Sequence, residues 1–526
     1  MAIKYDAIII GAGHNGLINA AYLARAGKKV LVLERRHLVG GATVTEEIYP
    51  GFKYSVFSYV VSLLRPEIIR ELSLTKHGLT MLPLESTLTP LPGDAYLYRD
   101  GDHFRTLRAI ARFSERDAEA YDEYGRTMYF MAKAVKYMLG IIPPDPTTLN
   151  PKDLFGLRDL AKHLLGLDEE NLYTLVKLMT MSSADFLEQW FETDVLKATL
   201  SASGIIGTFL GPRSPGTAYV LLHHYMGEID GNFRAWGFAK GGTGGVADAI
   251  AGAAREFGAV VKTDAAVSGV IVKNGRATGV ALQNGDEYRA EVVVSSLDPK
   301  QTFLNLVNPE LLPDELVTDI QKFQIRGSSA KVNLALDAAP ELACLPTPGP
   351  HLRGAISISP SVEYLERAYD DAKYGQFSRR PYIDIIIPSM IDPDMAPPGK
   401  HVMSCFVQYA PYDLKEGTWE KRREELGDTV VETLSEFIPN LKDIILHRQV
   451  MTPWDIEQTT GLSQGNIFQG ELSLAQLFFL RPVAGWAKYR TPIKNYYQCG
   501  SGTHPGGGIL GAQGRLAALE ILKDKG

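Results

Sequence analysis

Two short apolar runs, at residues 7–10 and 30–33, flank a helix-forming stretch over residues 17–26. The first run leads directly into a turn with the spacing GxGxxG, made of Gly11, Ala12, Gly13, His14, Asn15 and Gly16. The second run ends in Glu34, 21 residues after Gly13. This order of strand, glycine-rich turn, helix, strand and acidic residue predicts a βαβ unit that binds a dinucleotide.

Each part of this unit has a physical role at a pyrophosphate. Gly11 permits the tight turn, Gly13 lets the backbone approach the phosphates, and Gly16 lets the helix pack close to the strand. The helix N-terminus offers free N–H groups and a positive dipole end. Glu34 can accept hydrogen bonds from the adenosine ribose. A glycine-rich turn before a surface helix would explain the glycines but not the register of the other parts.

Two further glycine-rich segments bear on the choice between FAD and NAD. The doublet Gly40-Gly41 follows the second strand, where side chains would obstruct a chain passing from the pyrophosphate to a flavin. Taken alone, a plain loop explains this doublet equally well. Residues 500–511 hold six glycines in twelve positions, between an expected strand that starts at Tyr496 and an expected helix from about residue 512 to residue 522. Because each glycine loses much entropy on folding, a backbone that approaches a large flat ligand explains them better than packing does.

The middle of the chain predicts a third part of the same domain. A helix over residues 246–257 follows Gly241-Gly242-Thr243-Gly244-Gly245, and Asn274-Gly275 has the sequence of a tight hairpin turn. A second nucleotide fold, for NAD, is not expected, since residues 236–240 make a poor buried strand and the GxGxxG spacing is absent. Strands are expected at residues 259–263, 266–272, 277–282 and 290–296.

The remaining segments read as two long insertions. The first is mainly helical, with helices expected at 117–139 and 169–182, and the second mixes strands at 331–336, 383–387 and 402–409 with a helix at 418–436. The sequence therefore predicts a discontinuous nucleotide domain and a substrate domain with a helical subdomain. The expected nucleotide domain comprises residues 1–105, 236–300 and 485–526, and the expected substrate domain comprises residues 106–235 and 301–484.

Composition excludes several classes of function. The net charge of −7 argues against a nucleic-acid partner, which would need a basic face. The sequence contains no run of about 18 apolar residues, so no transmembrane helix is expected. The cysteines, Cys344, Cys405 and Cys499, are too far apart for a redox dithiol or a common zinc site, so no metal is expected.

Because residues 1–3 lead straight into the first strand, a cytoplasmic location is expected, or the mitochondrial matrix for a processed eukaryotic protein.

Three segments carry a resemblance to a known family: GAGHNG at residues 11–16, RRHLVGGATVTEE at 35–47 and CGSGTHPGGGILGAQGR at 499–515. They resemble the phytoene desaturase and carotenoid isomerase/ketolase group of FAD-dependent oxidoreductases. Residues 214–224 and 461–468 indicate one branch of that group, and the likeness runs essentially end to end. The implied fold is α/β, with a Rossmann-like, three-layer ββα FAD-binding domain and an inserted α+β substrate domain.

The resemblance also implies which residues bind FAD. It places the glycine turn at the pyrophosphate, Glu34 at the ribose, and Arg35 and Val267 near the adenine. Gly41 and Ala42 would pass the flavin, and residues 502–509 would contact the ribityl chain and the isoalloxazine. The implied cofactor-binding residues are Gly11, Ala12, Gly13, His14, Asn15, Gly16, Glu34, Arg35, Gly40, Gly41, Ala42, Val267, Gly502, Thr503, His504, Gly508 and Ile509.

The reaction stays less defined than the cofactor. The leading interpretation is hydride transfer from a hydrophobic, polyene-like or lipid substrate, by desaturation, oxidation or isomerisation. One alternative is a flavin amine oxidase, which would place an aromatic residue where this chain has Gly508. Another is a flavin-binding regulatory protein with little turnover.

No catalytic residue is assigned from the sequence. His223 and His224 are expected on a strand, where only one of them would face the flavin. The apolar stretch 128–139 is interpreted as a buried helix, with peripheral membrane contact as the alternative. Homo-oligomerisation is left open.

Overall fold

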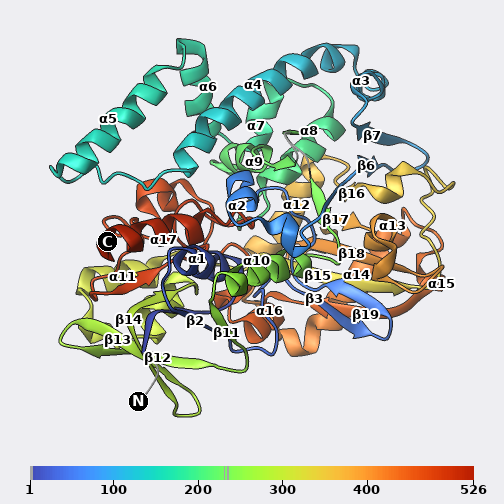
Figure 1. Cartoon of the computed structure of the whole chain (residues 1–526). Helices are drawn as coiled ribbons and strands as arrows, with labels where there is room; N and C mark the ends of the chain where they lie inside the picture. The colour runs from blue at the N-terminus through green and yellow to red at the C-terminus, as the bar shows by residue number, and fades with distance from the viewer. Residues whose placement is uncertain (1–3, 230–231, 234–235, 526) are drawn as a thin grey trace.

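The computed structural model describes residues 4–229, 232–233 and 236–525. Their strands gather mainly into two large sheets, and a group of helices caps one side of the molecule (Figure 1). The expected start of the chain at residues 1–3 and the domain boundary at residue 235 lie outside the described residues.

The first sheet unites the three separate segments that the sequence assigns to the nucleotide domain. Strands from all three segments pair in parallel, in the order β11, β2, β1, β14, with β20 pairing the end of β14. An antiparallel hairpin, β12–β13, joins the start of β14. Asn274 and Gly275 form its turn with φ values of 50° and 69°, which confirms the tight turn. The strands are β1 (Lys4–Ile10), β2 (Val30–Leu33), β11 (Val260–Lys262), β12 (Val267–Lys273), β13 (Arg276–Leu282), β14 (Glu287–Ser295) and β20 (Tyr496–Gln498).

Side chains alternate across this sheet and so bury both of its faces. Ile9 and Val32 pack against the helices on one face, whereas Ile8 and Leu31 pack against the hairpin and α11 on the other. This arrangement confirms the expected three-layer ββα domain. The helices on the first face are α1 (His14–Arg25), α10 (Gly244–Glu256) and α17 (Ala512–Lys525), and α11 (Asp314–Lys322) lies on the second.

The second sheet belongs mainly to the insertions, and the structure differs from the expected boundaries in two places. The hairpin β6–β7 precedes residue 105, yet β6 pairs in parallel with β16 of the second sheet. Conversely, α11 follows residue 300 but packs on the first sheet. Both differences arise from contacts between residues far apart in sequence, which a local periodicity does not encode. The strand order is β19 (Ile445–Met451), β15 (Ser329–Leu336), β18 (His401–Gln408), β17 (Tyr382–Ile386), β16 (Ala355–Ile358), β6 (Ser86–Pro90) and β7 (Tyr96–Asp100).

One face of the second sheet is covered by the amphipathic helix α14 (Trp419–Ser435), which buries Leu426, Val430 and Leu434 against it. Smaller elements connect the two sheets. They include β3 (Thr45–Tyr49), β4 (Phe52–Ser55), α2 (Pro66–Glu71), β5 (Met81–Pro83), β8 (Glu228–Ile229), β9 (Asn232–Phe233), β10 (Gly237–Ala239), α12 (Val362–Lys373), α13 (Pro388–Ile391), α15 (Leu441–Ile444) and α16 (Pro453–Thr460).

The first insertion forms the helical layer at the top of Figure 1. The helix expected at 169–182 ends at Thr180, because the Ser182 side chain caps a new helix by accepting from the Asp185 N–H. Met128 and Val135 are buried, so one side of stretch 128–139 is core as interpreted. The helices are α3 (His103–Ala111), α4 (Glu115–Leu139), α5 (Pro151–Leu165), α6 (Glu169–Thr180), α7 (Ser183–Glu188), α8 (Asp194–Ser201) and α9 (Thr217–Tyr225).

The expected strand at His223-His224 is wrong, since both residues lie in helix α9. Every residue of α9 is buried, and a helix buried on all sides has no polar face whose period could distinguish it from a buried strand. The two rings therefore point in directions about 100° apart rather than to opposite faces.

Candidate functional site

A cavity of about 400 Å³, which we call the α1 cavity, lies where β1 ends and α1 begins. Its walls also include residues from β12, from the loop after β14 and from the loop after α16. Ten of the predicted cofactor residues and Val267 line it, which brings the glycine turn and the expected adenine contact together. They are Gly11, Gly13, His14, Asn15, Gly16, Glu34, Arg35, Gly40, Gly41, Ala42 and Val267.

The surroundings of the three glycines in the turn differ, as shown by what a Cβ at each position would meet. Gly11 has a φ of +89°, and a side chain there would meet the Ser296 hydroxyl at 2.6 Å. A Cβ at Gly16 would lie 2.2 Å from the Gly11 carbonyl oxygen. A Cβ at Gly13 would meet nothing within 4 Å, because it would point into the α1 cavity. Gly11 and Gly16 are therefore required by the fold, whereas the fold itself leaves room for a side chain at Gly13.

The Glu34 carboxylate lies at the end of β2, as predicted. It accepts hydrogen bonds from the backbone N–H of Ala12 at 2.8 Å and of Arg36 at 3.0 Å. These bonds fix the carboxylate beside the glycine turn and leave lone pairs for a ribose. Ala12 itself is fully buried, and its carbonyl oxygen accepts a hydrogen bond of 2.8 Å from the Gly40 N–H, which ties the doublet Gly40-Gly41 to the turn. The Arg35 guanidinium donates to the Gln458 carbonyl at 3.0 Å on the cavity wall.

Polar atoms at the N-terminus of α1 lack partners. The N-cap residue, Gly13, offers no side-chain cap, and the buried atoms His14 Nε2 and Asn15 Oδ1 make no hydrogen bond in the described structure. Burial lowers the pKa of His14 to about 4, so its ring is neutral at physiological pH. The free backbone N–H groups of the first turn of α1, an open glycine and a cavity of this size fit a dinucleotide diphosphate.

The C-terminal glycine-rich loop meets the same turn. Asn15 donates to the Ser501 hydroxyl at 3.0 Å, and Asn19 donates to the Gly514 carbonyl at 3.0 Å. Gly508 adopts a φ of +112°, and Ile509 adopts a φ of +58°, which is strained for a β-branched residue. Thus both ends of the chain converge, as the resemblance requires.

The predicted residues of this loop do not line the α1 cavity, although Ser501 does. A Cβ at Gly502 would lie 2.3 Å from Pro299, so part of the glycine content reflects packing, contrary to the expectation from the sequence. Thr503 donates to the Gly500 carbonyl at 2.8 Å. The His504 ring packs edge-on against Phe478, and burial lowers its pKa to about 3. A ribityl contact by the His504 side chain therefore stays a prediction without support from this geometry.

Arg481 holds the C-terminal loop in place. It is fully buried and donates to the carbonyl oxygens of six residues, at 3.0–3.3 Å. Burial lowers its pKa to about 10, so it stays charged at neutral pH. Its role could not be read from the sequence, because Arg481 lies in a loop without periodicity. The acceptors are Phe468, Gly470, Glu471, Gln476, Ser501 and Thr503.

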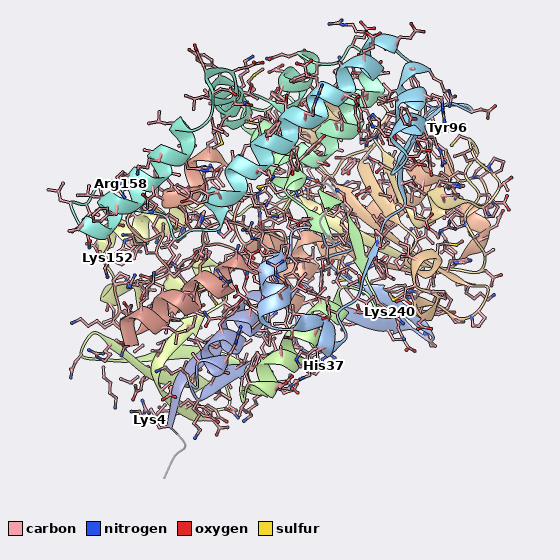
Figure 2. All side chains as sticks on the ribbon, turned by 45° about the horizontal axis from the view of Figure 1, so that its top comes forward. Lys4, His37, Tyr96, Lys152, Arg158 and Lys240 are labelled. Carbon is pink, nitrogen blue, oxygen red and sulfur yellow. The ribbon has the colours of Figure 1, made fainter. Side chains whose placement is uncertain are left out.

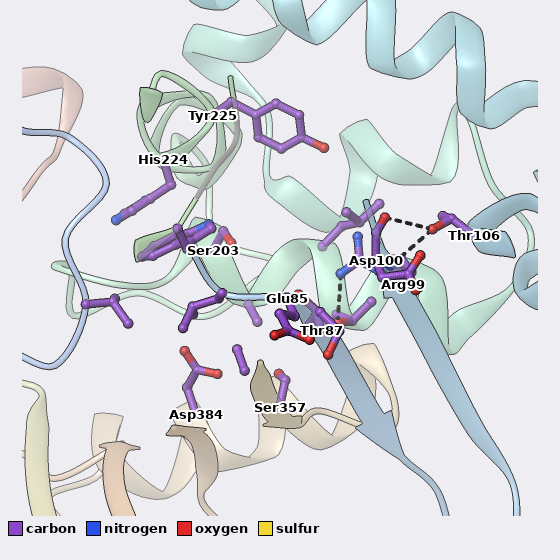
Figure 3. Close-up of a pocket in the computed structure, with 18 of the residues that line it drawn as sticks. Glu85, Thr87, Arg99, Asp100, Thr106, Ser203, His224, Tyr225, Ser357 and Asp384 are labelled. Atoms are coloured by element: carbon purple, nitrogen blue, oxygen red, sulfur yellow. Dashed lines mark hydrogen bonds between the residues drawn. The ribbon is translucent and has the colours of Figure 1, made fainter. Parts of the chain in front are cut away.

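A second cavity of about 610 Å³, which we call the central cavity, lies between the helical layer and the second sheet (Figure 3). In Figure 3, His224 and Tyr225 from α9 lie on one side and Asp384 and Ser357 from β17 and β16 on the other. Its lining is mixed. Apolar side chains include Val60, Leu84, Leu200, Ile206 and Trp236, and polar ones include Glu85, Arg99, Asp100, Thr199 and Asp384.

The paired histidines join the central cavity to the C-terminal loop. His223 Nε2 lies 3.2 Å from the Gly507 carbonyl oxygen, and the neighbouring His224 lines the cavity and stacks on Trp236 at 5.8 Å. Burial lowers the pKa of His223 to about 3 and of His224 to about 4. Both rings are neutral at physiological pH, so neither is a charged group for the reaction.

A buried cluster of titratable groups lies at the floor of the central cavity. Asp384 accepts a hydrogen bond of 2.6 Å from the Tyr59 hydroxyl, and the Lys331 ammonium lies 4.9 Å from the centre of the Tyr59 ring and donates to Ser404. Burial lowers the pKa of Lys331 to about 7 and raises the pKa of Asp384 to about 6. The sequence signal for this cluster is a lysine within the largely apolar strand 330–336, which local periodicity does not distinguish from a surface lysine.

Replacement of Lys331 by methionine is expected to remove a pH dependence of stability. In the wild type the Lys331 pKa is about 7 folded and 10.5 unfolded, so the unfolded chain binds the extra proton between these values. The free energy of unfolding therefore falls as the pH drops from 10.5 towards 7, by up to about 1.4 kcal/mol per pH unit. Urea denaturation of both proteins at several pH values in this window measures the difference. A difference that does not change with pH would contradict the lowered pKa.

Other charged residues near the site have structural partners. Asp455 pairs with Arg423 and caps α16, and Glu471 pairs with Arg326 at 2.7 Å. Among the described residues, no group of three or more His, Cys, Asp or Glu side chains is placed to hold a metal ion. None of the described helices combines the length and apolar character that a membrane span needs.

Comparison with known proteins defines the class. The family model for flavin containing amine oxidoreductase matches residues 16–522, and the chain belongs to this family. It is an FAD-dependent oxidoreductase. A solved oxidoreductase from Methanosarcina mazei superimposes with a TM-score of 0.62 at 18% identity, over 99% of this chain and 100% of that one, and shares the fold.

Three relatives are similar over nearly the whole chain. Pyridine nucleotide-disulfide oxidoreductase domain-containing protein 2 of Rattus norvegicus is 41% identical, covering 99% of this chain and 94% of the relative. A limonene dehydrogenase subunit of Castellaniella defragrans is 27% identical, covering 99% and 95%. A phytoene desaturase of Fusarium fujikuroi is 25% identical, covering 100% and 90%. These relatives confirm the resemblance found in the sequence.

Proposed function

We propose that the protein takes a hydride from a C–H bond of a small molecule that has an apolar body and one polar end. The observation that carries this proposal is the position of the central cavity. Through His223 and His224 it adjoins Gly507 and Gly508, the loop expected at the isoalloxazine. A substrate in the central cavity would therefore present its reacting carbon to the flavin.

The size and lining of the central cavity support this class of substrate. A volume of about 610 Å³ suits a drug-sized molecule. The apolar walls would hold its body, and Arg99 offers a charged donor for its polar end. Arg99 donates to the hydroxyls of Tyr121 and Thr199 at 3.4 Å, and no described carboxylate lies within ion-pair distance of it. The names of two relatives, a limonene dehydrogenase subunit and a phytoene desaturase, favour a terpenoid body.

The bound FAD supplies the hydride acceptor, and the chain supplies position and proton handling. Loss of a hydride leaves the substrate with a proton to release from a neighbouring C–H, O–H or N–H bond. Because burial lowers the pKa of Lys331 to about 7, its amine can accept that proton near neutral pH, and Tyr59 connects it to Asp384, which lines the cavity. The neutral His223 and His224 help to keep the junction of cavity and loop free of water and charge.

Anaerobic reduction of the flavin tests this proposal. We expect terpenoid carboxylic acids and alcohols to bleach the flavin absorbance faster than terpenoid hydrocarbons or alkylamines. Ser203→Phe, which places a ring in the central cavity, is expected to keep the flavin and slow its reduction by at least about tenfold. Arg99→Leu is expected to remove the preference for acids over hydrocarbons. If none of these compounds reduced the flavin, the proposal would fail and the interpretation as a flavin-binding regulatory protein would be favoured.

A further inference from the structure

Helices α4, α5 and α6 leave an unusual number of large apolar side chains in solvent. Six side chains between residues 130 and 176 are each more than half exposed, and they define what we call the α4–α6 face. In Figure 1 these helices form the outermost layer of the molecule, at the upper left. The six are Phe130, Leu149, Phe155, Leu165, Tyr173 and Val176, with exposed fractions of 56%, 87%, 58%, 77%, 61% and 54%.

Helix α5 buries few of its residues, which leaves much of this face exposed to water. Only Asp153 and Leu160 of its 15 residues are buried. Polar contacts fasten it to the body: the Lys488 ammonium pairs with Asp153 at 2.5 Å, and His163 Nε2 lies 2.9 Å from the Ala134 carbonyl oxygen. The large apolar side chains Phe155 and Leu165 of this helix are more than half exposed in the described structure. Large apolar side chains exposed in this number on neighbouring helices mark a surface that another body covers.

The charge of this segment indicates what covers it. Residues 126–165, the second half of α4 and all of α5, carry six Lys or Arg side chains against three Asp, a net charge of +3, whereas the whole chain has a net charge of −7. Acidic residues at 115–123 in the first half of α4 and at 168–170 at the start of α6 confine this positive charge to the second half of α4 and to α5, where Lys136 pairs with Glu228 at 2.5 Å.

Two of these cations lie over exposed aromatic rings. Lys133 Nζ is 4.8 Å from the Tyr129 ring centre, and the Arg158 guanidinium carbon is 5.1 Å from that of Phe155. Lys152 and Arg158 project at the outer end of the layer (Figure 2). Basic side chains therefore lie beside exposed aromatic rings on both α4 and α5.

We propose that the α4–α6 face docks onto the surface of a bilayer that contains anionic lipids. Apolar side chains would enter the boundary between headgroups and acyl chains, and the flanking lysines and arginines would contact lipid phosphates. A second copy of the chain fits less well, because a two-fold contact would place this positively charged face against itself. The inference does not depend on the proposed substrate.

Flotation of the flavin-loaded protein with lipid vesicles tests the proposal. We expect binding to vesicles of phosphatidylcholine with phosphatidylglycerol, weaker binding to phosphatidylcholine alone, and loss of the difference at high salt. The double variant Phe155→Ser/Leu165→Ser is expected to bind at least about tenfold more weakly. Tyr374→Ser, which removes an aromatic side chain that is 67% exposed on another surface, is the matched control and is expected to bind as the wild type does.

The flavin absorbance of each variant reports whether it is folded. Equal binding by the wild type and the double variant would overturn the proposal, as would the absence of binding to both kinds of vesicle. Size-exclusion chromatography with light scattering separates the remaining case. A wild-type dimer that the double variant converts to a monomer, without any vesicle binding, would assign the face to self-association and would also overturn the proposal.

Discussion

Gly13→Val is expected to give a folded protein that holds no flavin. Gly13 has an ordinary φ of −66°, and a Cβ there meets no protein atom within 4 Å. The valine side chain would therefore leave the fold intact and occupy the space at the N-terminus of α1 where a diphosphate must lie. Affinity for FAD should fall by more than about a thousandfold, because both the steric space and the backbone donors are lost together.

The measurement is the ratio of flavin to protein absorbance after purification, with circular dichroism as the test of folding. Gly125→Val is the matched control, since a Cβ at Gly125 also meets nothing within 4 Å but lies in α4, outside the α1 cavity. That variant should stay yellow. Gly16→Val should instead destabilise the fold, because its side chain would collide with the Gly11 carbonyl oxygen at 2.2 Å. A fully yellow Gly13→Val protein would contradict the assignment of the site.

Arg481→Met is expected to destabilise the protein strongly, although Arg481 lies in a loop. The substitution would leave six buried carbonyl oxygens without the donor that now joins residues 468–476 to residues 501–503. Each lost partner costs about 1–3 kcal/mol when no water can replace it, and partial relaxation keeps the total below the sum. We expect the free energy of unfolding to fall by more than about 4 kcal/mol.

Urea denaturation with the flavin-free protein measures this effect without the contribution of cofactor binding. Arg379→Met is the control, because the Arg379 side chain is 86% exposed and its ion pair with Asp371 should contribute less than about 1 kcal/mol. Arg481→Lys should also lower the free energy of unfolding, by more than Arg379→Met does, since an ammonium cannot reproduce the planar fork of donors. If Arg481→Met and Arg379→Met unfolded at the same urea concentration, the bonding scheme around Arg481 would be wrong.

The sequence was most informative where a local period or a fixed spacing carried the structure. The βαβ unit, the Asn274-Gly275 hairpin and the helix at the C-terminus all follow from short-range patterns and are confirmed. Helix α9 was mistaken for a strand because it is buried on all sides. The pairing of β6 with β16 was missed because it joins segments more than 260 residues apart, and no local pattern encodes it.

The residues of the site also divide into those that the sequence could predict and those that it could not. The residues of the glycine turn could be predicted to bind a dinucleotide because the GxGxxG spacing, the flanking strands and Glu34 are all visible in the sequence, and the resemblance to a known family then indicated FAD. Lys331 and Arg481 depend on what surrounds them in three dimensions, and their titration and bonding arise from burial rather than from neighbours in sequence. The Gly502 position shows the limit of reasoning from composition, since packing on Pro299 alone excludes a side chain there.

The central claim is that one FAD spans from the α1 cavity to the central cavity, enclosed by both ends of the chain. Electron density for the flavin-loaded protein tests it most directly. We predict the diphosphate over Gly13, and the isoalloxazine between Gly41 and Gly508 with one face open to the central cavity beside His224. An isoalloxazine that lies away from the C-terminal loop, or a nicotinamide dinucleotide in its place, would contradict the account.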